Sequence, residues 1–188
     1  GEDPFGLLSI LSSIQPEKEI SDQAVVELHQ RYPFDLEKIA TYLSSFTATG
    51  MWPDINYEDK KRSGWEPKLH AERILELVKL YNSKQTDYYH SQEVEKVIHK
   101  ALDYWFTAKP VCLNWWYNQI GIPKTLGTAF ILFEEKLTPA EKQKAITVME
   151  NAKFGMTGQN KVWLAGNVMM RALLQNDYEL VKMARDTI

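Results

Sequence analysis

The chain has 188 residues, of which 44% are hydrophobic and 25% charged, and its formal net charge is −3. This composition excludes a disordered or collagen-like chain, and the length suffices to bury one core without disulfides. No apolar run approaches the ~18 residues of a membrane span, and the N-terminus lacks the cationic stretch of a signal peptide. The acidic balance also argues against a general nucleic-acid binder. We therefore expect one domain over residues 1–188.

Apolar residues recur at intervals of three and four in successive segments, and no segment alternates with a period of two. The pattern predicts helices over 36–46, 71–81, 94–105, 122–137 and 162–173, with further helices beginning at 139 and 177. Ser91 fits an N-cap, and Thr138 with Glu141 forms a capping box with Pro139 at the first helical position. Pro67 suits a first helical turn. The predicted fold is all-α, and paired helices of this kind indicate hairpins packed as an α-solenoid or an α/α toroid.

Three stretches between the expected helices carry no helical stripe and are candidates for function. They are residues 47–65, 107–121 and 155–161. The first contains Trp52, Tyr57 and Trp65, which either pack or bind, and we expect at least one of them to pack.

The second stretch contains the sequence Asn114-Trp115-Trp116-Tyr117-Asn118. Two adjacent Trp residues on a loop cannot both point into one core, so at least one indole is expected to face a groove. Indole faces suit the C–H face of a sugar ring, and Asn side chains can both donate to and accept from hydroxyls. A carbohydrate-binding platform and two Trp residues that cap helix ends are equally consistent with this sequence.

The third stretch, GMTGQNK, lacks the spacing of a phosphate-binding loop. Asn160 lies near the predicted start of a helix, where an N-cap is the simpler interpretation and an amide directed at a ligand carboxylate is the alternative.

The remaining candidates predict little chemistry. Cys112 is the only cysteine, and a buried structural thiol is favoured over a nucleophile. The four histidines show no metal-binding spacing: they are His29, His70, His90 and His99. His70 adjoins an apolar stripe and is expected to be a packing residue. We expect no metal and no cofactor.

The three stretches and the helices between them resemble a known family in their order and spacing. The segments TGMWPDINYEDKKRSGW, PKLHAERILELVKLY, DYWFTAKPVCLNWWYNQIGIPKTLG and TGQNK, with the helix containing Arg171, follow one another in this order. In order and separation they resemble the N-terminal catalytic domain of polysaccharide lyase family 8, the chondroitin AC, hyaluronate and xanthan lyases. The resemblance covers residues from about 47 to the C-terminus, and the chondroitin AC lyases look most similar.

The resemblance implies an incomplete α/α toroid that lines a cleft for an acidic polysaccharide. The implied reaction is β-elimination: the C5 proton of a uronate is abstracted, the 4-linked group leaves, and a 4,5-unsaturated uronide remains. Asn160 matches the family's amide that neutralises the uronate carboxylate, so the resemblance implies a catalytic role for it. Trp115 and Trp116 match the aromatic platform, with Asn114 and Asn118 as polar neighbours.

The sequence also differs from the family pattern, and the differences lead to further expectations. The family's His base, Tyr acid and Arg residues follow the Asn on later helices, and none of the four histidines here matches the base. This chain alone is therefore expected to bind substrate without turnover. Family members are secreted or periplasmic, so a signal peptide removed before Gly1 is implied, and a monomer is expected. A non-catalytic carbohydrate-binding module and an α/α-toroid glycoside hydrolase are the alternatives.

Overall fold

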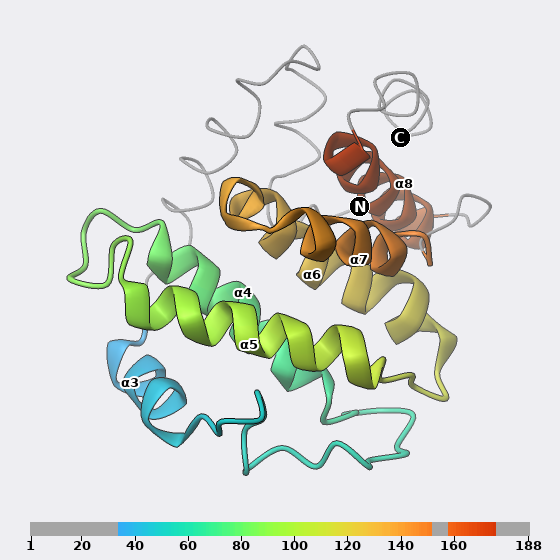
Figure 1. The fold of residues 1–188 in the computed structure, drawn as a ribbon. Helices are drawn as coiled ribbons and strands as arrows, with labels where there is room; N and C mark the ends of the chain where they lie inside the picture. Colours follow the sequence, from blue (N-terminus) through green and yellow to red (C-terminus); the bar gives the residue numbers. More distant parts are fainter. Residues whose placement is uncertain (1–33, 152–157, 176–188) are drawn as a thin grey trace.

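The computed structural model describes residues 34–151 and 158–175, and for 158–165 only the backbone. Every regular element in these ranges is helical (Figure 1). The elements are α3 (Leu36–Ser45), α4 (Lys68–Tyr81), α5 (Gln92–Ala108), the π-helix η1 (Tyr117–Gly121), α6 (Ile122–Leu132), the 3₁₀ turn η2 (Glu134–Lys136), α7 (Pro139–Met149) and α8 (Gly158–Gln175). Within these ranges no helix is both long and apolar enough to cross a membrane. The all-α prediction is confirmed.

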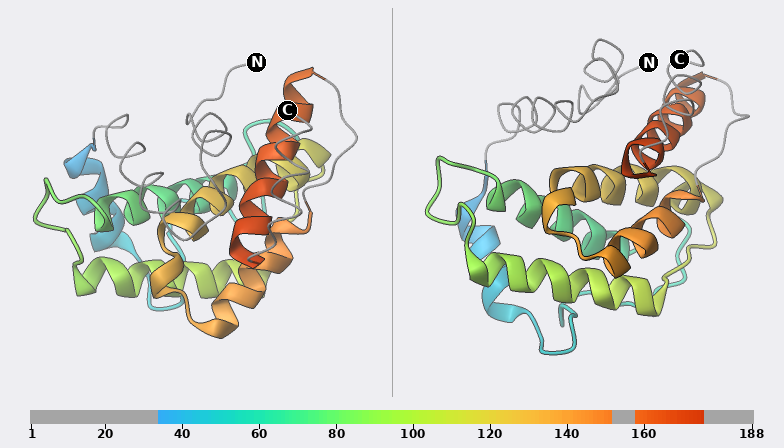
Figure 2. Two further views of the ribbon diagram at one scale, coloured as in Figure 1. Left: turned by 90° about the horizontal axis from the view of Figure 1, so that it is seen from above. Right: turned by 45° about the horizontal axis from the view of Figure 1, so that its top comes forward.

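The helices pack as two consecutive hairpins. α4 contacts α6 and α6 contacts α8, so these three helices form one row, while α5 packs on α4 and α7 packs on α5, α6 and α8. Figure 2 shows α3 at one side of this arrangement and α8 at the other. The C-terminal ends of α5 and α7 lie near the segment that leads into α6, because residues of all three line one cavity.

The predicted caps are confirmed. Ser91 Oγ accepts a hydrogen bond from the backbone N–H of Val94 at 3.4 Å. At the start of α7, Thr138 Oγ1 accepts from the N–H of Glu141 at 3.1 Å, and the Glu141 carboxylate accepts from the N–H of Thr138 at 2.9 Å. Both motifs satisfy N–H groups that the first helical turn leaves without partners.

Several predicted helix limits differ from those observed, most of them by one to four residues. The helix predicted over 122–137 ends at Leu132, and it is preceded by helical turns that begin at Trp115, inside the stretch expected to be a loop. Pro67 is the N-cap residue of α4 rather than part of its first turn. The helix expected from 177 lies outside the described residues.

The long connection before α4 is anchored by its aromatic residues, as expected for at least one of them. Trp52 and Trp65 are both fully buried. The Nε1–H of Trp52 donates to the Tyr42 carbonyl at 2.9 Å, and that of Trp65 donates to the Asp59 carbonyl at 3.1 Å. Burying these indoles with their N–H groups paired fixes the connection against α3 and α4.

His70 is the centre of this anchor, as its expected packing role requires. Four aromatic rings surround its ring at centroid distances of 5.0–5.8 Å: those of Trp52, Tyr57, Tyr104 and Trp105. Its Nε2 lies 2.7 Å from the Ala101 carbonyl, which can only accept, so the neutral ring donates there. Its Nδ1 then accepts from the Tyr57 hydroxyl at 2.9 Å.

Candidate functional site

The two adjacent tryptophans lie in the first helical turn of the segment leading into α6. Asn114 Oδ1 accepts from the backbone N–H of Trp116 at 3.1 Å, which is the hydrogen bond that an N-cap side chain makes. Successive residues of a helix point about 100° apart, so the two indoles diverge. Trp115 is 44% exposed, and Trp116 is half-buried. Neither indole is fully buried.

The amides of Asn114 and Asn118 both bond to the protein backbone. Asn114 Nδ2 donates to the Arg62 carbonyl at 3.0 Å and so joins the tryptophan segment to the long connection before α4. Asn118 Oδ1 accepts from the N–H of Cys112 at 2.9 Å, and its Nδ2 donates to the Cys112 carbonyl at 2.7 Å. These two hydrogen bonds hold the Asn118 side chain against the backbone of Cys112.

A π-helix follows the tryptophans directly and is tied to α8. In η1 the hydrogen-bond ladder shifts by one residue, a local change that is often found at functional sites. The carbonyl of Ile120 accepts from Nδ2 of Asn167 on α8 at 3.0 Å, and Asn167 is fully buried. α8 is the helix that contains Asn160. One buried hydrogen bond therefore links the tryptophan segment to the helix of the predicted catalytic amide.

Gly121, the last residue of η1, touches the Trp116 indole so closely that a side chain would displace it. A Cβ at this position would lie 2.7 Å from Cζ3 of Trp116. We expect Gly121→Ala to move this indole while changing the free energy of unfolding by less than about 1 kcal/mol, since alanine favours helix. The measurement is near-ultraviolet circular dichroism, with Trp116→Phe assigning the signal.

Gly127→Ala is the matched control, because its Cβ would meet the flexible end of the Met149 side chain. An unchanged Trp116 signal in Gly121→Ala would contradict the close packing of this ring.

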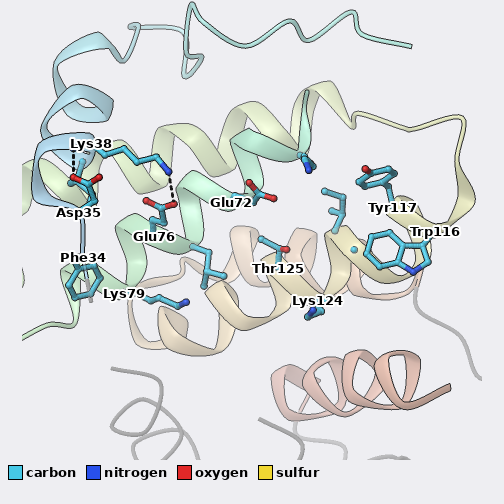
Figure 3. A pocket seen from close by; sticks show the side chains of 15 residues that line it. Phe34, Asp35, Lys38, Glu72, Glu76, Lys79, Trp116, Tyr117, Lys124 and Thr125 are labelled. Carbon is cyan, nitrogen blue, oxygen red and sulfur yellow. Dashed lines mark hydrogen bonds and ion pairs between the residues drawn. The ribbon is translucent and has the colours of Figure 1, made fainter. Parts of the chain in front are cut away.

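Trp116 lies at one end of a groove of about 750 Å³, here named the α4–α6 groove (Figure 3). It is lined by Phe34, Asp35, Lys38 and Ile39 at the start of α3, by Lys68, Glu72, Leu75, Glu76 and Lys79 on α4, and by Trp116, Tyr117, Gly121, Ile122, Lys124 and Thr125 on the segment of η1 and α6.

The α4–α6 groove carries charges of both signs. Lys38 Nζ lies 3.6 Å from a carboxylate oxygen of Glu76 (Figure 3). Burial lowers the pKa of Lys79 to about 8 and raises the pKa of Glu72, because a low-dielectric environment disfavours both charged forms. The groove therefore does not present a uniformly positive surface to an acidic ligand.

A second cavity, of about 650 Å³, adjoins the same segment of η1 and α6 through Asn118, Gln119 and Ile122 and is here named the α5–α7 pocket. It is lined by Trp105, Phe106, Lys109, Pro110, Val111, Asn118, Gln119, Ile122, Lys144, Thr147, Val148 and Asn151. Asn118 belongs to this pocket, whereas Trp116 belongs to the α4–α6 groove.

Asn160 and the histidines are the remaining candidate residues. The backbone of Asn160 lies in the first turn of α8, and its side chain is outside the described residues, as is His29. His90 stacks on Tyr89 at 3.9 Å between ring centroids, and His99 Nδ1 lies 2.7 Å from a carboxylate oxygen of Glu141. Among residues 34–151 and the described side chains of α8, no three His, Cys, Asp or Glu residues are grouped to hold a metal ion.

Comparison with known proteins identifies the family. Residues 15–188 match the description "Polysaccharide lyase family 8, N terminal alpha-helical domain". The chain belongs to polysaccharide lyase family 8. Chondroitinase-AC of Pedobacter heparinus is 31% identical over 155 residues, which are 80% of this chain and 22% of that protein. Xanthan lyase of Bacillus sp. is 24% identical over 157 residues, 74% of this chain and 17% of that protein.

Solved structures agree with this assignment. The structure of chondroitinase AC lyase, solved in complex with oligosaccharides, superposes on this chain with a TM-score of 0.74 and 28% identity. The match covers 95% of this chain and 26% of that one. The helical hairpins described here are thus part of an α/α toroid, which confirms the predicted fold class. The chain spans about a quarter or less of the length of these relatives.

Sequence reasoning missed Asn167 and the lining of the α5–α7 pocket. Asn167 is the one polar residue in the run 162–170 of α8, and its partner Ile120 lies 47 residues away. An asparagine inside a predicted apolar stripe is the one signal that could have identified it, because a buried amide requires a partner.

Proposed function

We propose that this chain is the substrate-binding part of a lyase that cleaves uronate-containing glycosaminoglycans, chondroitin or hyaluronan, by β-elimination. The observation that carries the proposal is the 31% identity to a chondroitinase over 80% of the chain, together with family membership over residues 15–188. The exposed Trp115 and the groove beside Trp116 are consistent with a sugar platform.

The proposed role of Asn160 follows from the chemistry of the reaction. The C5 proton of a uronate is weakly acidic because the neighbouring carboxylate is already negative. Charge that builds on this carboxylate in the transition state must meet a fixed donor, and an Asn amide can donate without itself taking up the proton. Asn160 therefore stabilises the transition state, and a separate base must remove the proton.

The described histidines are poorly placed to be that base. His70 is fully buried with both ring nitrogens hydrogen-bonded, and burial lowers its pKa to about 4. His99 is engaged by Glu141, and His90 lies beside Tyr81, at the far end of α5 from the tryptophan segment. We infer that this chain by itself binds substrate and does not turn it over.

The platform is tested by replacing its indoles. Trp115→Ala and Trp116→Ala are each expected to weaken binding of chondroitin and hyaluronan oligosaccharides by about 1–3 kcal/mol, by analogy with aromatic stacking on planar rings. The measurement is the Kd from isothermal titration calorimetry. Tyr89→Ala is the control, since Tyr89 is also an exposed aromatic residue but lies on the connection between α4 and α5. Equal Kd values in all three variants would show that Trp115 and Trp116 do not form a sugar-binding platform.

The finer parts of the proposal concern the compartment, the assembly and the substrate. We propose a secreted or periplasmic monomer, a single domain over residues 1–188, and Asn114 as a residue that supports the platform. A non-catalytic carbohydrate-binding module would bind the same polymers, and only product chemistry in an active enzyme distinguishes it. Elimination creates an ultraviolet-absorbing unsaturated uronide.

A further inference from the structure

We propose that the α5–α7 pocket is a second sugar subsite that binds an anionic pyranose through Lys109 and Lys144. The class of polymer in this proposal rests on the proposed function. The location of the subsite rests on the pocket alone. The cavity of about 650 Å³ falls within the range of roughly 300–1,000 Å³ that small-molecule sites occupy.

The lining of the pocket combines apolar and polar side chains. Trp105 and Phe106 at the end of α5 supply buried aromatic surface, and Gln119 on η1 and Asn151 after α7 supply amides. This combination suits a sugar, whose ring carbons are apolar and whose hydroxyls both donate and accept.

The charged residues that line the pocket favour an anionic ligand. Its lining contains two lysines and no carboxylate among the residues described, whereas the α4–α6 groove includes Asp35, Glu72 and Glu76. Neither Lys109 nor Lys144 forms an ion pair within the described part of the chain. In a chain with a net charge of −3, this pocket is therefore a locally cationic site.

The backbone at Lys109 provides an independent observation. Lys109 ends α5 in the left-handed conformation, with φ 47° and ψ 58°, and its N–H donates to the Trp105 carbonyl at 2.9 Å. Glycine is the residue usually found at this position, because a Cβ makes the conformation unfavourable. Backbone strain of this kind is concentrated at functional sites. A lysine in place of glycine at this position points to a use for its ammonium group at the pocket.

The tryptophan segment connects this pocket to the sugar platform. Asn118 lines the pocket, and its amide holds the backbone of Cys112 three residues before Trp115. We expect a polymer chain lying over Trp115 to place a neighbouring sugar in the pocket.

The test measures binding of the 188-residue chain to three oligosaccharides by calorimetry. Hyaluronan carries carboxylates alone, chondroitin sulfate carries carboxylates and sulfates, and carboxyl-reduced chondroitin sulfate carries sulfates alone. We expect Lys109→Gln with Lys144→Gln to raise the Kd at least tenfold for each oligosaccharide whose anion the pocket accepts. The matched control is Lys84→Gln with Lys136→Gln, which removes the same charge at exposed positions outside both cavities and is expected to change Kd less than twofold.

The variant Lys109→Gly distinguishes an effect on ligand binding from an effect on the stability of the fold. Glycine relieves the left-handed backbone, so this variant is expected to unfold at a higher temperature and yet bind more weakly. Similar losses in the pocket and control pairs would overturn the subsite and leave the proposed function standing, because general electrostatic attraction would explain both. Absence of binding by the unchanged chain would overturn the subsite and the proposed binding function together.

Discussion

Replacing Asn160 with alanine is expected to lower the turnover number of an active lyase containing these residues by about 10²–10³-fold, the loss typical when one transition-state donor is removed. The KM is expected to change little, because the amide matters most as charge develops on the uronate carboxylate. The measurement is the initial rate of unsaturated uronide formation over a range of chondroitin concentrations.

Two further variants sharpen this expectation. Asn160→Asp replaces the donor with a negative charge and is expected to raise KM as well as lower turnover, because two carboxylates then face each other. Asn56→Ala, at an exposed asparagine in the connection before α4, is expected to leave both parameters unchanged. A loss in Asn160→Ala that appears entirely in KM would make this residue a ground-state binding residue.

The second large effect concerns acid stability and arises from His70. Burial lowers its pKa from 6.5 to about 4, with the Arg73 charge adding to the shift and the hydrogen bond to Ala101 opposing it. Between these two values the unfolded chain binds a proton that the folded chain does not. The contribution of His70 is therefore fully present above pH 6.5 and is lost as the pH falls toward 4, about 3 kcal/mol in all.

Denaturant unfolding at a series of pH values measures this contribution. His70→Gln removes the titrating group, and its free energy of unfolding is expected to be lower at pH 7 and to fall less steeply between pH 6.5 and 4. Parallel curves for the two proteins would show that His70 does not titrate in this window.

The parts of the fold that depend on neighbouring residues were predictable from the sequence. Ser91 and the pair Thr138 and Glu141 mark helix starts because their partners lie three residues away. His70 could be assigned to packing by its place beside an apolar stripe, whereas packing of Trp52 was one of two alternatives. The details of their hydrogen bonds, such as that from Trp52 to Tyr42, depend on how the chain returns on itself.

The tryptophan segment was harder, because its conformation depends on tertiary contacts. A loop was expected around Trp115, whereas the segment is helical and enters a π-helix whose Ile120 carbonyl bonds to Asn167 on α8. Asn118 was expected to be a polar neighbour of the sugar platform, and its amide also bonds to Cys112, a contact that no periodicity reveals. The two lysines of the α5–α7 pocket come from separate helices and meet only when α5 and α7 pack.

The central proposal is that this chain binds the glycan substrate of a family 8 lyase and does not itself supply the base. The most direct measurement incubates the purified 188-residue chain with chondroitin and with hyaluronan, following oligosaccharide binding and ultraviolet absorbance in parallel. We expect binding that Trp115→Ala weakens, with no sustained rise in absorbance. Sustained production of unsaturated uronide, abolished by Asn160→Ala, would contradict the account and place the base within this chain, at one of its histidines or tyrosines.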